Sequence, residues 1–63
     1  MRSLFDIDGK LIPSELIGQE VVKMVSDSFI LTRSGQLFER VSQSLVRVEI
    51  DQVWFNLSYR DSL

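Results

Sequence analysis

The alternation of apolar and polar residues is clearest between Leu45 and Tyr59. Apolar side chains occupy even positions before Asp51 and odd positions after Gln52. A period of two is typical of a strand with one buried face, and the change of parity means that one regular strand cannot hold both halves. A tight turn at Asp51-Gln52 restores a common face and predicts three facing pairs: Ile50 with Val53, Val48 with Phe55, and Val46 with Leu57. The alternative is a bulge in one bent strand, because Asp-Gln is not a favoured two-residue turn.

The N-terminal third carries a second hairpin signal. Asp8-Gly9 lies between apolar residues, and Gly tolerates the positive φ that a type I′ turn requires. We therefore expect strands over Ser3–Ile7 and Lys10–Ile12. Pro13 and Gly18 then bracket a short segment in the order that a single helical turn favours.

Residues 19–26 admit two interpretations. Three β-branched valines, at positions 21, 22 and 25, favour a strand from Gln19 to Ser26. A helix to Val25 is the alternative, because Ile17, Val21 and Met24 would share one helical face. Gly18 would lie inside that helix and weaken it, so the strand is the favoured interpretation.

A third hairpin is expected from Phe29 to Val41. Strands over Phe29–Arg33 and Gln36–Val41 flank a two-residue turn at Ser34-Gly35. This register sets Leu31 opposite Phe38 on one face and leaves apolar residues on the other face as well. Such a hairpin suits a strongly bent sheet, or one whose second face is covered by the helical turn or by a second subunit.

Together these segments predict a single mainly β domain over residues 1–63. About five to six short strands at intervals of about eight to twelve residues indicate a small, strongly bent antiparallel sheet or barrel. The order of elements resembles that of an SH3-like or Sm-like barrel, with at most one short helical turn near residues 13–18.

Composition narrows the possible functions. The chain has 63 residues, a net charge of -2, and neither Cys nor His. This excludes disulfides, zinc fingers, thiol nucleophiles and histidine acid–base chemistry. A domain of about 60 residues buries only about 60% of the surface of its unfolded chain. Self-association is the remaining source of stability, and we expect a homo-oligomer.

The same features suggest where such a chain acts. No signal peptide is recognisable at the N-terminus, and no apolar run approaches the roughly 20 residues of a membrane span. The absence of Cys is compatible with a reducing compartment. We therefore expect a cytoplasmic protein without membrane contact, of the kind that serves as an accessory or inhibitor protein in a bacterium or phage.

One motif suggests catalysis. The stretch LFDIDGKL at residues 4–11 resembles the first motif of the haloacid dehalogenase phosphatases, and Ile30-Leu31-Thr32 is similar to their second. The resemblance implies a nucleophile at Asp6, a general acid at Asp8 and bound Mg²⁺, although Lys10 stands where that family usually has Thr. Its parallel sheet needs crossovers of a dozen or more residues, for which this chain has no room. A hairpin with solvated acids is the favoured interpretation, and we expect no enzyme, cofactor, small-molecule substrate or metal site.

Trp54 is the strongest candidate for a functional residue. The parity that buries its neighbours directs Trp54 outward, onto a polar face where a large aromatic side chain can anchor a protein partner. The expected partner-binding residues are Trp54, Arg47, Glu49, Asn56 and Arg60. Two other interpretations bury Trp54, either under the helical turn or by closure of the barrel.

A weak single-stranded nucleic-acid site is the alternative function. It would combine Trp54 and Phe38 as stacking platforms with Arg33 and Arg40. The basic residues are interspersed with acids instead of forming a basic stripe, and this argues against nucleic acid as a partner.

Overall fold

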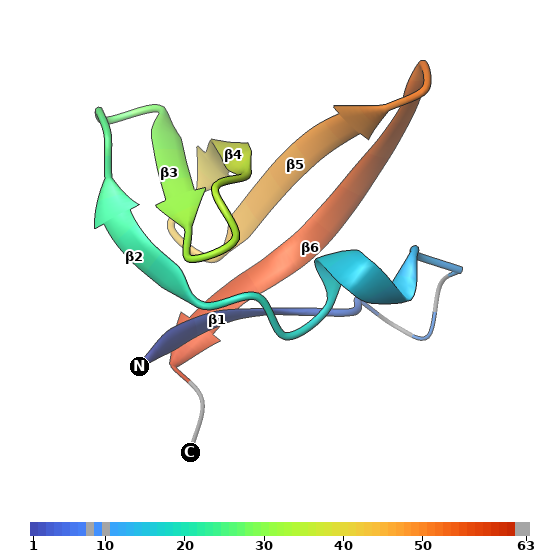
Figure 1. Ribbon diagram of the computed structural model, residues 1–63, viewed down its shortest axis with the longest axis horizontal. Coiled ribbons are helices and arrows are strands. Elements are labelled where there is room, and N and C mark those ends of the chain that lie inside the picture. Colours follow the sequence, from blue (N-terminus) through green and yellow to red (C-terminus); the bar gives the residue numbers. More distant parts are fainter. Residues whose placement is uncertain (8, 10, 62–63) are drawn as a thin grey trace.

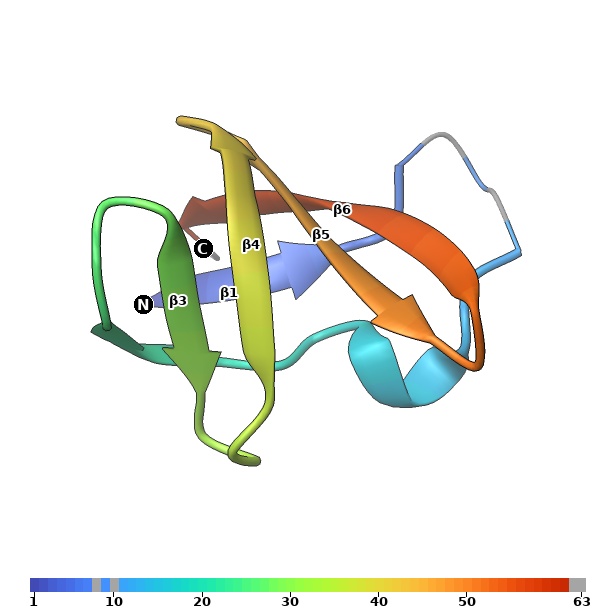
Figure 2. The ribbon, with the colours of Figure 1, turned by 90° about the horizontal axis from the view of Figure 1, so that it is seen from above.

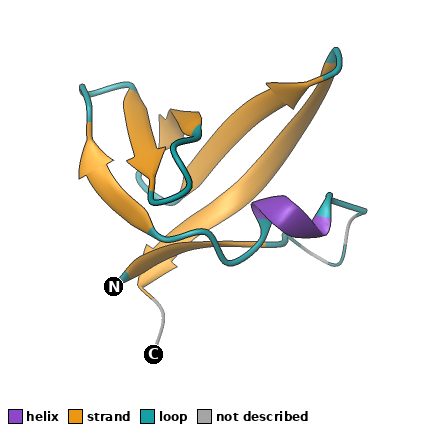
Figure 3. Ribbon diagram, in the orientation of Figure 1, coloured by secondary structure: helices purple, strands orange, loops and turns teal. Residues whose placement is uncertain are grey.

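The computed structural model describes residues 1–7, 9 and 11–61. These residues form a mainly β fold, as predicted, with all strands antiparallel (Figure 1). In chain order the elements are β1 (Arg2–Phe5), η1 (Ser14–Leu16), β2 (Val21–Met24), β3 (Phe29–Thr32), β4 (Leu37–Ser42), β5 (Leu45–Ile50) and β6 (Val53–Asp61). The predicted helical turn is η1, one short turn of 3-10 helix (Figure 3). Within the described residues, no helix has the length and apolar character needed to cross a membrane.

The six strands form one sheet that closes almost completely into a barrel. Their order is β1-β6-β5-β4-β3-β2, so β1 and β2 are the two ends of the sheet. Near Ser3 and Glu20 these ends meet through an isolated antiparallel bridge. The Leu4 amide donates to the Gln19 carbonyl (3.0 Å), and the Gly18 amide donates to the Leu4 carbonyl (2.6 Å). Figure 2 shows the strongly curved sheet from above.

The core fills the inside of this barrel. Each strand except β2 contributes a fully buried side chain, and η1 inserts Leu16. Ile12, Val21, Ile50 and Phe55 pack against this core from its margin. Its buried apolar members are Leu4, Leu16, Ile30, Phe38, Val46, Val48, Leu57 and Tyr59.

The β5–β6 hairpin has the predicted register. Ile50 pairs with Val53, Val48 with Phe55, and Val46 with Leu57. The turn is a two-residue turn, in which Asp51 and Gln52 have φ of 52° and 68°, so the bulge alternative is wrong. The prediction that Val53 is buried is also wrong, since the residue is 51% exposed. The tip of the hairpin projects beyond the core (Figure 1).

The predicted N-terminal hairpin is wrong. β1 pairs with β6, from Arg2 opposite Asp61 to Phe5 opposite Ser58, and Leu11 and Ile12 belong to no strand. The pairing with β6 places Leu4 opposite Tyr59, so that both side chains enter the core. The predicted hairpin partner of only three residues, Lys10–Ile12, could not offer Leu4 a comparable buried neighbour. Asp8 and Lys10, which this prediction included, lie outside the described residues.

The segment from residue 19 to 41 is mostly as predicted, apart from one register. β2 is a strand, and the helical alternative is wrong. In the β3–β4 hairpin, however, Ile30 faces Phe38 and Leu31 faces Leu37, one residue away from the predicted pairing. The loop that closes this hairpin contains three residues instead of two. Its last residue, Gly35, adopts the left-handed conformation (φ 91°), and its amide donates to the Thr32 carbonyl (2.9 Å).

Candidate functional site

The outward face of the β5–β6 hairpin holds four of the five predicted partner-binding residues. Glu49 lies opposite Trp54, and Arg47 lies opposite Asn56. Trp54 is 53% exposed, so neither the helical turn nor barrel closure covers it. The turn η1 instead directs Leu16 into the core.

A chain of contacts fixes the Trp54 side chain. The Arg47 guanidinium carbon lies 4.7 Å from the centroid of the indole, within cation–π range. The same guanidinium donates through Nε to Glu39 Oε1 on β4, at 2.9 Å. Because Arg47 is held from both sides, the indole has a defined position before any partner arrives.

The charge around Trp54 is acidic. Glu39 neutralises Arg47, whereas Glu49 and Asp51 are exposed and make no ion pair with any described residue. The hairpin tip therefore presents an aromatic side chain beside two uncompensated carboxylates, an arrangement that favours a basic group on whatever binds there.

A groove runs beside the outer half of β6. It has a volume of about 300 Å³, and residues of β6 line one side while the segment between β1 and η1 lines the other. Leu11 stands at its rim and is 99% exposed. We call it the β6 groove; its lining consists of Ile7, Leu11, Ile12, Val53, Trp54, Phe55 and Asn56. Sequence reasoning missed this groove because it assigned Ile7, Leu11 and Ile12 to a hairpin.

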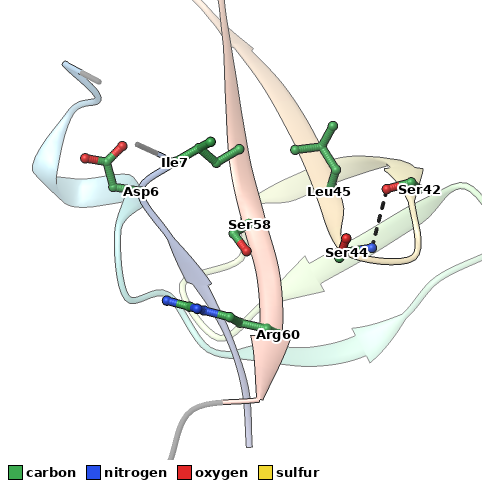
Figure 4. A pocket seen from close by; sticks show the side chains of 7 residues that line it. All are labelled: Asp6, Ile7, Ser42, Ser44, Leu45, Ser58 and Arg60. Atoms are coloured by element: carbon green, nitrogen blue, oxygen red, sulfur yellow. Dashed lines mark hydrogen bonds between the residues drawn. The ribbon is translucent and has the colours of Figure 1, made fainter. Parts of the chain in front are cut away.

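Arg60, the fifth predicted residue, lies away from Trp54. Its guanidinium carbon is 4.4 Å from the centroid of the Phe5 ring, over the part of β6 that pairs with β1. It lines a separate, more open hollow of about 550 Å³ with Asp6, Ser42 and Ser58 (Figure 4). In the described residues, the buried Asp6 Oδ1 accepts no hydrogen bond. No group of three His, Cys, Asp or Glu side chains that could hold a metal occurs in this part of the chain.

A second surface was not predicted as a site. The outward positions of β3 and β4, with the residue after β2, expose a group of apolar side chains. Phe29 is 38% exposed, Leu37 48% and Val25 50%, and Leu31 faces Leu37. We call Val25, Phe29, Leu31 and Leu37 the apolar face. Lys23 and Glu39 border it, paired in register with Leu31 and Phe29 respectively.

The residues of the nucleic-acid hypothesis do not form one surface. Phe38 is completely buried, so it cannot stack on a base. Arg40 lies beside the buried Tyr59 ring, 5.6 Å from its centroid. Arg33 is bound to Glu20, and this hydrogen bond lowers the pKa of Glu20 and raises that of Arg33.

The phosphatase resemblance is likewise not matched by the surroundings of its residues. Asp6 follows a strand of an antiparallel sheet, whereas the resemblance implies a parallel one. The Thr32 hydroxyl is buried and donates to Gln19 Oε1 at 2.6 Å. Asp8, the implied general acid, lies outside the described residues.

Comparison with known proteins adds no assignment to this geometry: no family model, no curated protein and no solved structure matches the chain.

Proposed function

We propose that this chain is a non-enzymatic interaction module that docks on another protein through the outer half of its β5–β6 hairpin. The observation that carries the proposal is Trp54, a half-exposed indole held by Arg47 beside an apolar groove. Tryptophan is among the residues that dominate binding energy at protein interfaces, especially where an adjacent pocket can be emptied of water.

The surroundings of Trp54 define the chemistry of the partner. The β6 groove offers apolar contacts from Val53, Phe55 and Leu11. Glu49 and Asp51 add negative charge, and neither forms an ion pair with a described residue. A complementary partner therefore presents an apolar side chain with a lysine or arginine close to it.

The same charges favour protein over nucleic acid as the partner. Nucleic-acid affinity depends mainly on cations that neutralise phosphates. Among the described residues at this surface, the cation Arg47 is already paired with Glu39, and Glu49 and Asp51 are carboxylates.

Self-association is a second candidate function, and the apolar face favours it. Exposed apolar patches of a few hundred Å² on small proteins commonly mark interaction sites. The occupant that fits is a second copy, because Lys23 and Glu39 border the face from different strands. A two-fold axis through the face can bring Lys23 of each copy toward Glu39 of the other, which is also bound to Arg47 of its own chain. The face meets the Trp54 surface at the Glu39–Arg47 ion pair, but its apolar residues belong to β3, β4 and the end of β2, whereas the docking surface belongs to β5 and β6.

Affinity capture from a lysate with purified variants tests docking. Trp54→Ala removes the indole from a half-exposed position, so the chain is expected to fold while partner recovery falls about tenfold or more. Val41→Ala, a truncation at another half-exposed apolar position, is the matched control and is expected to recover partners like the wild type. Equal recovery by a folded Trp54→Ala protein contradicts the proposal.

A further inference from the structure

We infer that the partner docks by adding an extended strand to the open edge of β6, with its backbone bonded to Trp54 and Asn56. This inference rests on the proposed function and specifies how the partner binds. Strand addition of this kind obtains affinity from main-chain hydrogen bonds and specificity from alternate side chains.

The first support is that β6 is longer than the strand beside it. β1 pairs only with Ser58–Asp61, whereas β6 begins at Val53. Along residues 53–57, β5 is therefore the one strand of the described chain that pairs with β6 (Figure 2).

The second support is the direction of the backbone groups. Ile50 and Val53 close the two-residue turn, and the Tyr59 amide donates to the Ser44 carbonyl at 2.9 Å. Odd residues of β6 therefore bond toward β5, and even residues point to the opposite edge. In the described part of the chain, no backbone hydrogen bond from outside the sheet reaches Trp54 or Asn56. Their N–H and C=O groups face the β6 groove, where no described residue bonds to them.

The third support is the shape of the groove. The open edge of β6 bounds it on one side, and Ile7, Leu11 and Ile12 bound it on the other. A groove enclosed on two sides suits a single extended segment. The edge of a second folded barrel would bring its own flanking segment into the same space, so a second copy fits this site poorly.

Alternation then assigns the side chains of the added strand. Those on the inner side lie level with Val53 and Phe55 and enter the apolar groove. Those on the outer side lie beside Trp54. Glu49 is two strands away from them, about 10 Å, a distance that a lysine and a glutamate side chain can span together. The structure thus favours a segment in which apolar and basic residues alternate.

Amide hydrogen exchange with a defined probe tests the inference. In the free protein, the Trp54 and Asn56 amides should exchange faster than those of Phe55 and Leu57, which bond to β5. Addition of the capped peptide Lys-Val-Lys-Val-Lys-Val should slow exchange at Trp54 and Asn56 by about tenfold at saturation. The same peptide with alternate backbone nitrogens methylated, or with Glu in place of Lys, should bind far more weakly. Trp54 and Asn56 amides that are already protected in the free protein, or that the peptide leaves unchanged, overturn the inference.

Two substitutions at one position separate the backbone from the side chain. Asn56→Pro removes an N–H that points to the open edge, where proline is tolerated, and should abolish peptide binding and partner capture. Asn56→Ala removes the side chain but keeps the N–H, so it should retain far more of both than Asn56→Pro does. If Asn56→Pro fails to fold, the methylated peptide carries the same test.

The combined results distinguish this inference from the proposed function. Capture lost in Trp54→Ala but kept in a folded Asn56→Pro means that the partner uses the Trp54 surface without adding a strand. Capture kept in both folded variants refutes the proposed function itself. Protection of Trp54 and Asn56 that appears when the protein alone is concentrated identifies a second copy as the occupant and overturns the inference.

Discussion

Two residues with side chains adopt the left-handed backbone conformation in the β5–β6 turn, Asp51 with φ 52° and Gln52 with φ 68°. A side chain in this conformation costs about 1–2 kcal/mol, less for Asp, whose carboxylate can hydrogen-bond locally. The turn matches the twist of the two strands, and the pairs on the buried face outweigh the cost. The hairpin that presents Trp54 is thus stabilised by strand pairing along its length, whereas its turn residues destabilise it.

Replacing Gln52 by glycine should therefore stabilise the protein. Relief of the left-handed cost exceeds the extra chain entropy that glycine loses on folding, so the free energy of unfolding should rise by about 0.5–1 kcal/mol. Urea denaturation measures the change, with Gln52→Ala as the control that keeps the strain. A lower midpoint for Gln52→Gly would show that the glutamine side chain has stabilising contacts in solution.

The Glu20–Arg33 pair gives a pH dependence at the residue scale. The hydrogen bond from Arg33 lowers the pKa of Glu20 in the folded state. The unfolded state therefore binds the proton first as pH falls, so the contribution of Glu20 is present above its ordinary pKa and is lost as pH falls through the lower folded value. Glu20→Gln should be less stable than wild type near neutral pH, and the gap should close in acid. Thermal unfolding of both proteins over a pH series measures this, and a gap that does not change with pH contradicts it.

At the scale of elements, local patterns and distant contacts differ in how far the sequence could predict them. The β5–β6 register followed from parity alone, because one side of the hairpin is buried and a slip would expose Val46 and Leu57. Parity also gave the outward direction of Trp54. The β3–β4 register did not follow, because both faces of that hairpin carry apolar residues and Ser34-Gly35 fits a two-residue or a three-residue turn equally well.

The strand that pairs with β1 could not be predicted from local sequence patterns either. The pairing of Leu4 with Tyr59 joins residues from opposite ends of the chain, and no turn signal announces it. The β6 groove depends on this pairing, since it exists only where β1 ends before β6 does. The shared outward face of Trp54, Arg47, Glu49 and Asn56 could be predicted from the sequence, whereas the groove and the open edge could not.

Gln19 joins three elements at the closure of the barrel. Its amide nitrogen donates to the Glu15 carbonyl at 2.8 Å and to Gln36 Oε1 at 2.9 Å. Its amide oxygen accepts from the hydroxyls of Thr32 (2.6 Å) and Ser34 (2.9 Å). This network joins η1, β3 and the β3–β4 turn at the point where β1 meets β2.

Gln19→Ala should accordingly destabilise the protein by about 1–3 kcal/mol, because the buried Thr32 hydroxyl loses its closest partner. Urea denaturation gives the value. Gln43→Ala is the matched control at an exposed position of the β4–β5 turn and should change stability little. Equal stability of the two variants would show that water replaces the network without loss.

At the scale of the whole molecule, the two surfaces are proposed to serve different partners. The apolar face on β3 and β4 suits a second copy, and the hairpin surface suits a foreign segment. A chain of 63 residues buries only part of its apolar surface in its core. The small size that limits the core therefore also leaves apolar side chains exposed on both surfaces.

Leu37→Ser should weaken self-association, because it replaces an exposed side chain of the apolar face by a hydroxyl group while the core stays intact. Sedimentation velocity over a range of protein concentrations should show a wild-type protein in monomer–dimer exchange and a variant that stays monomeric. Trp54→Ala, on the other surface, is the control and should dimerise like the wild type. A wild-type protein that remains monomeric at every concentration contradicts the proposed dimer.

The most direct test of the account is photo-crosslinking in the native host, with a photoreactive amino acid introduced at Leu11 and, separately, at Leu37. Leu11 is fully exposed at the rim of the β6 groove, and Leu37 lies on the apolar face. The account predicts that the probe at Leu11 crosslinks to another protein, identified by mass spectrometry, and that this product disappears when Trp54→Ala is added. The probe at Leu37 should crosslink to a second copy. A probe at Leu11 that yields no product, or yields only the chain itself, contradicts the claim that the hairpin docks a protein partner.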